Sequence, residues 1–234
     1  MRARANRALR EWREPDEGIW EVRGDPKHFV YSKVMCWVAL DRAIRLAEMD
    51  GLEDACLPAW RTGRDEIRAE VLARGFDEEL GAFTQSYGSG SLDASNLVLA
   101  GTGFISSDDP RFIGTVRATQ RELTRGGLVD RYRVSDTDDG FAGEEEGTFV
   151  ICSLWLALAC IQIGDVEAAE DIFERVCAYA NDLGLLAEEL TPEGEQLGNY
   201  PQAFTHIALI LCAFELERAA AGDRSNVSAL PLSA

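Results

Sequence analysis

Apolar residues recur every three or four positions along most of this chain, the spacing that gives an α-helix one buried face. The spacing predicts about eight helices. Seven of them cover 3–13, 28–49, 57–73, 110–126, 147–163, 165–182 and 202–220, and a short one follows a cap at 91–93 and ends at residue 100. Gly51 and Gly75 follow the second and third of these as stop signals. The pattern therefore predicts an all-α protein.

Local signals mark several helix ends. Asp109-Pro110 has the form of an N-cap followed by a first-turn proline, and Gly126-Gly127 is the predicted end of that helix. The pair Gly164-Asp165 alone separates two helices, which predicts an αα-hairpin. Two strand-like pieces, 82–87 and 128–132, are short and bounded by glycines, so we interpret them as loop decorations.

Two of the predicted helices, 148–163 and 203–214, are apolar on nearly every face. Helix 165–182 instead alternates apolar and acidic positions. Because a helix that is apolar all round must be enclosed by others, we predict an inner and an outer layer. This arrangement is an α/α toroid, with 148–163 and 203–214 in its inner layer.

Composition and charge narrow the classes of partner. The chain has 234 residues, 46% of them hydrophobic, which allows one large domain or two small ones. Its mean hydropathy of -0.14 is ordinary for a soluble protein. The net charge of -18 argues against nucleic acid and anionic membranes, which such a field repels. A neutral sugar is not repelled.

Six cysteines lie mostly in apolar helical stretches and without any Cys-x-x-Cys pair, so we interpret them as reduced core residues. The two histidines, His28 and His206, lack ligand spacing with them, which argues against a zinc site. Met1 precedes a basic segment with no apolar core, and the longest apolar run, 149–163, is 15 residues. We expect a cytoplasmic protein without a signal peptide or membrane span.

Two short stretches each place a carboxylate in an aromatic or apolar setting: Gly18-Ile19-Trp20-Glu21 and 184–189, which ends on Glu188-Glu189. Cleaving a glycosidic bond needs one protonated and one ionised carboxyl group across the sugar. Trp20 offers a stacking face for a pyranose and a wall expected to raise the pKa of Glu21. The alternative is that each glutamate is a solvated loop residue, and one of Glu188 and Glu189 simply caps its loop.

Three other features have competing interpretations. Arg131-Tyr132 offers a fork of hydrogen-bond donors for sugar hydroxyls, but an arginine paired with one of the abundant acids is equally expected. Acidic residues over 136–146 fail the EF-hand spacing, which favours a solvated loop over calcium. His206, in an apolar helix, is more typical of a hydrogen-bonded core histidine than of a catalyst.

An ordered set of motifs lies between residues 12 and 216. They are Gly18–Gly24, His28-Phe29, Ser32–Arg42, Gln85–Gly88, Leu92–Ser95, Asp109–Arg111, Arg131-Tyr132, Gly184–Glu189 and Gly198–His206. With them the chain resembles the bacterial branch of glycoside hydrolase family 15, the glucoamylases and family-15 trehalases. The resemblance implies an (α/α)6 barrel and an inverting, exo-acting α-glucosidase that needs no metal or cofactor.

The resemblance also implies roles for residues. Glu21 falls on the general acid and Glu188 on the general base, while Trp20, Arg131 and Tyr132 fall on contacts to the glucosyl residue. The fungal members place a second acid directly after the general acid, where this chain has Val22. That departure leaves the choice between trehalose and an α-1,4-glucan open. The role of Glu189 is a separate open point.

A second departure concerns completeness. The barrel of this family has twelve helices, against the eight predicted here, and its acid follows the fifth helix rather than the first. We therefore expect residues 1–221 to form a partial toroid, the C-terminal portion of a catalytic domain whose start is internal, with a frayed tail over 222–234. Two alternatives to an active glucosidase remain: a catalytically inactive fragment, and a helical scaffold that binds proteins. An incomplete barrel is also expected to self-associate through exposed apolar faces.

Overall fold

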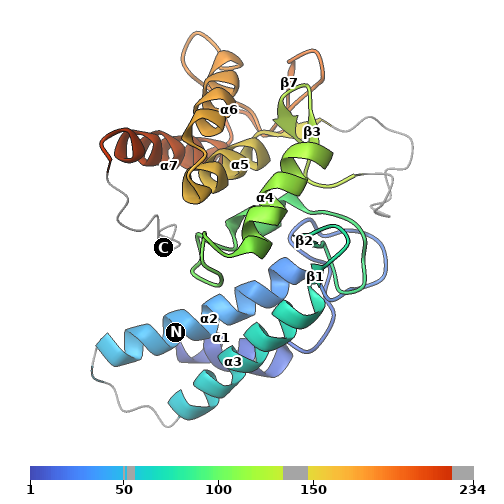
Figure 1. Cartoon of the computed structure of the whole chain (residues 1–234), viewed down its shortest axis with the longest axis vertical. Helices are drawn as coiled ribbons and strands as arrows, with labels where there is room; N and C mark the ends of the chain where they lie inside the picture. The colour runs from blue at the N-terminus through green and yellow to red at the C-terminus, as the bar shows by residue number, and fades with distance from the viewer. Residues whose placement is uncertain (50, 52–55, 134–146, 223–234) are drawn as a thin grey trace.

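The computed structural model describes residues 1–49, 51, 56–133 and 147–222 (Figure 1). Within these ranges the helices are α1 (Arg2–Glu11), α2 (Val30–Met49), α3 (Leu57–Arg74), the 3₁₀ helix η1 (Ala94–Val98), α4 (Pro110–Glu122), α5 (Val150–Ile163), α6 (Val166–Ala178) and α7 (Ala203–Ala220). All eight predicted helices are confirmed, the short one as a 3₁₀ turn. The acidic segment 136–146 and the tail from residue 223 lie outside the described residues.

The helices form two groups that share one hydrophobic core. In Figure 1, α1, α2 and α3 lie together at the bottom, while α4 to α7 lie above them. η1 contacts α2, α4 and α5, so it joins the two groups at the centre. Buried residues from both groups belong to a single hydrophobic cluster.

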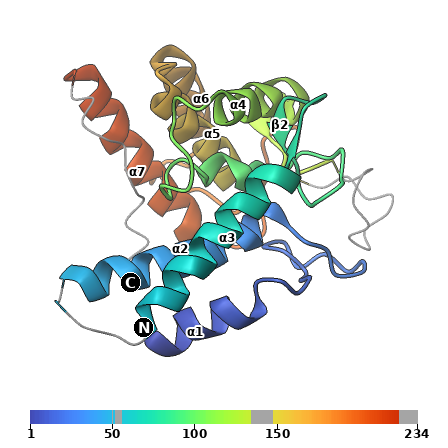
Figure 2. The ribbon, with the colours of Figure 1, turned by 60° about the horizontal axis from the view of Figure 1, so that its bottom comes forward.

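The prediction for the two apolar helices is confirmed for α5 and wrong for α7. α5 buries most of its length against α4, α6, α7 and η1. In α7 only Thr205, Ala208 and Cys212 are buried. The helices in contact with α7 are α5 and α6, and they cover one of its sides. Figure 2 shows α7 projecting from the edge of the molecule.

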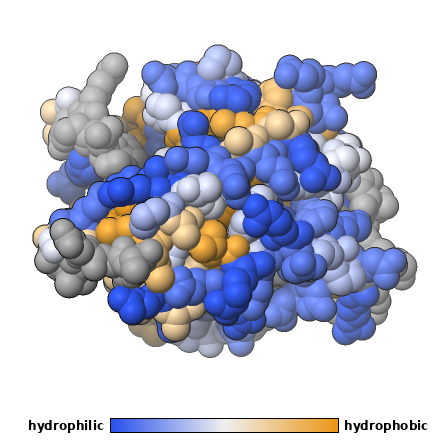
Figure 3. Space-filling view, turned by 90° about the horizontal axis from the view of Figure 1, so that it is seen from below, coloured by the Kyte–Doolittle hydropathy of each residue, from blue (hydrophilic) through white to orange (hydrophobic). Residues whose placement is uncertain are grey.

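The exposed side of α7 is strongly apolar. Its large apolar side chains are exposed by 54% to 68%: Phe204, Ile207, Ile210 and Phe214. Their spacing of three to four residues places them along one face of the helix. Figure 3 shows apolar surface, in orange, among hydrophilic residues on the face seen from below. We call these four α7 side chains the α7 stripe.

Short antiparallel strands decorate the helices. β1 (Phe76–Asp77) pairs with β2 (Ala82–Phe83), and β3 (Thr124–Arg125) pairs with β4 (Leu128–Val129). The two predicted strand-like pieces therefore belong to small hairpins. Gly126-Gly127 forms the turn of the second hairpin, with φ of 60° and 86°, instead of ending a helix, since α4 already ends at Glu122.

A third small sheet was not predicted. It is ordered β5 (Thr148–Phe149), β6 (Glu189–Leu190), β7 (Gln196–Leu197), and all of its pairs are antiparallel. The predicted helix 147–163 therefore begins at Val150. Thr148 and Phe149 are extended because their backbone pairs with a segment about forty residues further along the chain. The helical spacing of apolar residues cannot predict a pairing with so distant a segment.

Local capping follows the sequence signals. Asp109 accepts the backbone N–H of Arg111 at 2.9 Å, and Asp93 accepts that of Ser95 at 2.8 Å. Gly164 is left-handed with φ of 87°, as the αα-hairpin between α5 and α6 requires.

All six cysteines are free thiols, and burial raises the pKa of the Cys160 and Cys212 thiols to about 12. Among the described residues, no helix combines the length and apolarity needed to cross a bilayer.

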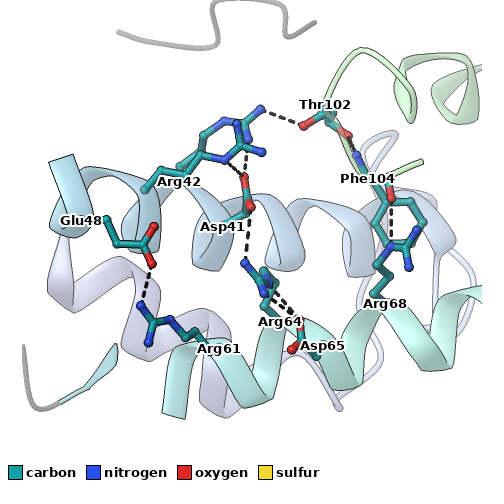
Figure 4. A network of polar contacts seen from close by, with 10 residues as sticks. Asp41, Arg42, Glu48, Arg61, Arg64, Asp65, Arg68, Thr102 and Phe104 are labelled. Atoms are coloured by element: carbon teal, nitrogen blue, oxygen red, sulfur yellow. Dashed lines mark hydrogen bonds and ion pairs between the residues drawn. The ribbon is translucent and has the colours of Figure 1, made fainter. Parts of the chain in front are cut away.

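A buried carboxylate joins α2, α3 and the loop before α4 (Figure 4). Asp41 has only 5% of its side chain exposed, and it pairs with Arg42, with Arg45 at 2.8 Å and with Arg64 at 3.8 Å. Arg42 also donates to the carbonyl of Thr102 at 2.8 Å. One carboxylate thus holds three guanidinium groups from two helices.

Replacing Asp41 with asparagine is expected to lower the free energy of unfolding by about 2–3 kcal/mol, because the three arginines lose a desolvated counter-charge. Denaturant unfolding measures this change. Asp65→Asn is the matched control, since Asp65 is 66% exposed and pairs only at the surface with Arg64. Its effect should stay within about 0.5 kcal/mol. Equal effects of the two substitutions would contradict this account of Asp41.

Candidate active site

A closed loop presents Trp20 and Glu21. Asp16 and Lys27 exchange two backbone hydrogen bonds, of 2.9 and 2.8 Å, across the base of the loop. Val22 donates its backbone N–H to the carbonyl of Glu17 at 3.2 Å. Glu21 is exposed and has φ of 50°, and it is the one non-glycine with positive φ in the described ranges. Such a backbone conformation persists only where surrounding contacts impose it, and it is concentrated at functional sites.

Trp20 is half-buried and held on several sides. Its ring lies 5.6 Å from that of Phe149 and 6.1 Å from that of Trp155. Its indole Nε1–H donates to both carboxyl oxygens of Asp93, at 3.0 and 3.1 Å. The predicted stacking residue is therefore a packed side chain with a fixed orientation.

Arg131 lies against the same aromatic group. Its guanidinium carbon is 4.5 Å from the ring of Tyr132, 5.1 Å from that of Phe149 and 5.7 Å from that of Trp20. Arg131 is 8% exposed and Tyr132 1%. A guanidinium among aromatic faces is favoured electrostatically and keeps a fixed direction. The structure thus brings together Trp20, Arg131 and Tyr132.

The second predicted carboxylate lies immediately before β6. Glu188 is half-buried, and its Oε2 accepts the side-chain Nδ2 of Asn199 at 2.9 Å and its backbone N–H at 3.2 Å. Glu188 donates its backbone N–H to the carbonyl of Asn199, and its own carbonyl accepts the backbone N–H of Val150, each at 3.0 Å. Glu189 pairs with Phe149 and Leu197 inside the small sheet.

The N-terminus of α7 supports the residues just before Glu188. Gln202 donates its N–H to the carbonyl of Leu186 at 3.0 Å, and Thr205 donates its hydroxyl to that of Ala187 at 3.1 Å. The ring of His206 accepts from the backbone of Leu186 at 3.4 Å and contacts the carbonyl of Gln202 at 2.7 Å. His206 is thus a hydrogen-bonded structural residue, as its sequence context predicted.

Phe149 is the point where the two predicted segments meet. Its ring contacts Trp20, the neighbour of Glu21, and its backbone pairs with Glu189, the neighbour of Glu188. The next residue, Val150, donates directly to the carbonyl of Glu188. A single residue of β5 therefore links two loops that are far apart in the sequence.

Four residues of this site were given no role in it from the sequence. They are Gln85, Asp93, Phe149 and Trp155. Gln85 and Asp93 were named only within the motifs of the family resemblance, Asp93 also within the predicted cap 91–93. Phe149 and Trp155 were predicted only as members of an apolar stretch. No local signal distinguishes an aromatic residue that borders a site from one that fills a core. As for metals, the described residues contain no group of three or more His, Cys, Asp or Glu side chains that could hold an ion.

The family model for glycosyl hydrolases family 15 matches residues 8–165 and 161–214. The chain belongs to glycosyl hydrolases family 15. The family-15 match covers both candidate carboxylates, Glu21 and Glu188.

Curated relatives carry the name trehalase. The chain is 52% identical over 220 residues to the trehalase of Mycolicibacterium smegmatis. This alignment covers 94% of this chain and 32% of that protein. Identity and coverage are the same for the trehalase of Mycobacterium tuberculosis. The chain thus spans about a third of the length of the curated relatives it matches.

Solved structures share the helical fold. A glycosidase variant in complex with glucose superposes with a TM-score of 0.75 at 21% identity, covering 89% of this chain and 57% of that one. The glucoamylase from Saccharomycopsis fibuligera gives 0.76 at 10% identity, covering 93% and 60%. Glucoamylases are (α/α)6 barrels, so this family-15 chain has the all-α fold predicted from its sequence and matches just over half of each neighbour.

Proposed function

We propose that this chain carries the general acid and the general base of an inverting, exo-acting α-glucosidase. The observation that carries the proposal is the meeting of the Trp20-Glu21 loop and the Glu188-Glu189 strand at Phe149. The geometry of these two segments supports a pair of carboxyl groups facing one space. Family membership supports their use on a glycosidic bond.

We further propose trehalose as the substrate. The identity of 52% to proteins named trehalase supports this choice over an α-1,4-glucan. Trehalose is uncharged, so the chain's net charge of -18 does not oppose its binding. Trp20 and Arg131 then contact the glucosyl ring whose bond is broken.

In the proposed reaction Glu21 donates a proton to the glycosidic oxygen as the bond to the anomeric carbon breaks. Glu188 takes a proton from a water molecule that attacks this carbon from the opposite face. The configuration at the attacked carbon inverts, and the two carboxyl groups are expected to stand about 6.5–9.5 Å apart. A retaining enzyme would need about 5–5.5 Å instead.

The product configuration tests the proposal directly. Hydrolysis of trehalose with inversion releases one β-glucose from the attacked ring and one α-glucose as the leaving group, whereas retention releases two α-glucose molecules. Proton NMR during the first minutes of reaction distinguishes these outcomes. Maltose and soluble starch, assayed in parallel, test the substrate choice.

Two proteins should be assayed: this chain, and a chimera in which it replaces the aligned 220 residues of the M. smegmatis trehalase. We expect β- and α-glucose in equal amounts from the chimera. Activity confined to the chimera would identify the isolated chain as an inactive fragment. No glucose from either protein, while the parent trehalase remains active, would contradict the proposed function.

A further inference from the structure

Asp93 holds a buried carboxyl group beside the proposed acid without belonging to the acid–base pair. It is 4% exposed and lies immediately before η1, as the N-cap of that turn. Oδ1 accepts the backbone N–H of Ser95 at 2.8 Å and the indole N–H of Trp20 at 3.0 Å. Oδ2 accepts the same indole at 3.1 Å and the side-chain amide of Gln85 at 3.3 Å.

Both oxygens of Asp93 thus act as acceptors, which is the pattern of an ionised carboxylate. Burial raises the pKa of Asp93, while the hydrogen bonds from Ser95, Trp20 and Gln85 act in the opposite direction. A neutral serine, threonine or asparagine caps a helical turn equally well without a buried charge. Capping alone therefore does not account for a carboxylate at this position.

The second role of the carboxylate is visible in its bond to Trp20. Trp20 and Asp93 are 73 residues apart in the chain, and the indole N–H reaches both carboxyl oxygens. Phe149 and Trp155 contact the ring of Trp20, so Asp93 supplies the directional contact that sets the rotation of the indole. Glu21 follows Trp20 directly, with its backbone in the left-handed region.

We propose that Asp93 is a positioning residue: through the indole of Trp20 it holds the backbone that presents Glu21. The positioning role of Asp93 rests on the proposed function only in that Glu21 is taken as the general acid. The carboxylate acts on the loop and not on the sugar. Asparagine cannot replace it, because asparagine has a single acceptor oxygen and must turn an NH₂ group toward a donor.

Indole NMR on the purified chain tests the contact. The five tryptophans give five side-chain N–H signals, and the one that disappears in Trp20→Phe belongs to Trp20. In Asp93→Asn this signal should move upfield, because a carboxylate acceptor deshields the proton more than an amide does. Asp41→Asn is the matched control, a buried aspartate in the α2–α3 network, and it should leave the Trp20 signal in place.

Hydrogen exchange on the same preparations, and steady-state kinetics of the same variants in the trehalase chimera, test the consequence. In Asp93→Asn and in Trp20→Phe, exchange over residues 18–23 should rise on the order of tenfold, as loss of one charge-assisted hydrogen bond implies. Trehalose turnover should fall about ten- to a hundredfold in kcat with KM changed less. The double variant should lose no more than the worse single one, because both remove the same contact.

The outcomes separate the two proposals. An unmoved Trp20 signal, or an unchanged exchange rate over 18–23 in both variants, would overturn the positioning role even if the chain releases glucose. If neither the wild-type chain nor the chimera releases glucose, while the signal shift and the faster exchange are observed, the contact between Asp93 and the loop is supported and the catalytic proposal is contradicted instead. Trp20→Phe keeps the test valid if Asp93→Asn does not fold.

Discussion

Glu188→Gln is expected to lower trehalose turnover by a factor of about 10²–10⁴, the usual effect of removing a positioned acid or base. Glutamine keeps the size of the side chain and can still contact Asn199, but it cannot take a proton from water. Glu21→Gln should lose turnover by a similar factor, because the leaving oxygen then departs without a proton. Steady-state rates of the trehalase chimera described above measure both effects.

Matched controls separate catalysis from changes in the loops. Glu193→Gln alters an exposed glutamate just beyond β6, and Glu17→Gln alters one in the same loop as Glu21. Both should retain turnover within about twofold, since exposed carboxylates that take no part in the proton transfers contribute little. Near-normal turnover of Glu188→Gln, with a large loss in Glu189→Gln, would transfer the base role to Glu189.

The α7 stripe, Phe204, Ile207, Ile210 and Phe214, is expected to drive self-association of the chain. Burying a large apolar side chain that is fully exposed stabilises by about 1.5–3 kcal/mol, so covering four half-exposed ones contributes roughly 3–6 kcal/mol. That range corresponds to about 10²–10⁴ in an association constant. Ile207→Gln together with Ile210→Gln should therefore weaken association on the order of tenfold or more.

Sedimentation velocity over a range of concentrations measures this association, and binding of a hydrophobic dye reports the exposed surface. Met49→Gln is the control, since Met49 is 81% exposed at the end of α2, away from the stripe. It should leave the sedimentation profile unchanged. A wild-type chain that stays monomeric at all concentrations and binds no dye would contradict the prediction.

The helices and their ends were predictable because their causes are local. A period of 3.6 residues, the cap at Asp109 and the left-handed Gly164 act within one turn of backbone. The prediction for Gly126-Gly127 was wrong because a glycine pair suits a helix end and a tight hairpin turn alike. Thr148 and Phe149 were assigned to a helix because their strand partner lies far along the chain.

The exposure of α7 shows a second limit of sequence reasoning. The apolar residues of a helix indicate how much apolar surface it has to bury, but not which elements of the fold can cover that surface. α5 and α7 are similarly apolar in sequence, yet α5 contacts α4, α6, α7, η1 and two strands, while α7 contacts α5 and α6 on one side. Whether a helix is buried depends on the elements that pack against it, and the packing of the whole fold decides which elements those are.

The sequence by itself determined the all-α class, the order of the helices and the two carboxylate motifs, because hydrophobic period, caps and short motifs are encoded within a few residues. Only the tertiary structure decided that Trp20 is fixed by Asp93 and that Phe149 joins the Glu21 loop to the Glu188 strand. These contacts join residues 40 or more positions apart. Their formation depends on the packing of complete helices, which no local pattern in the chain records.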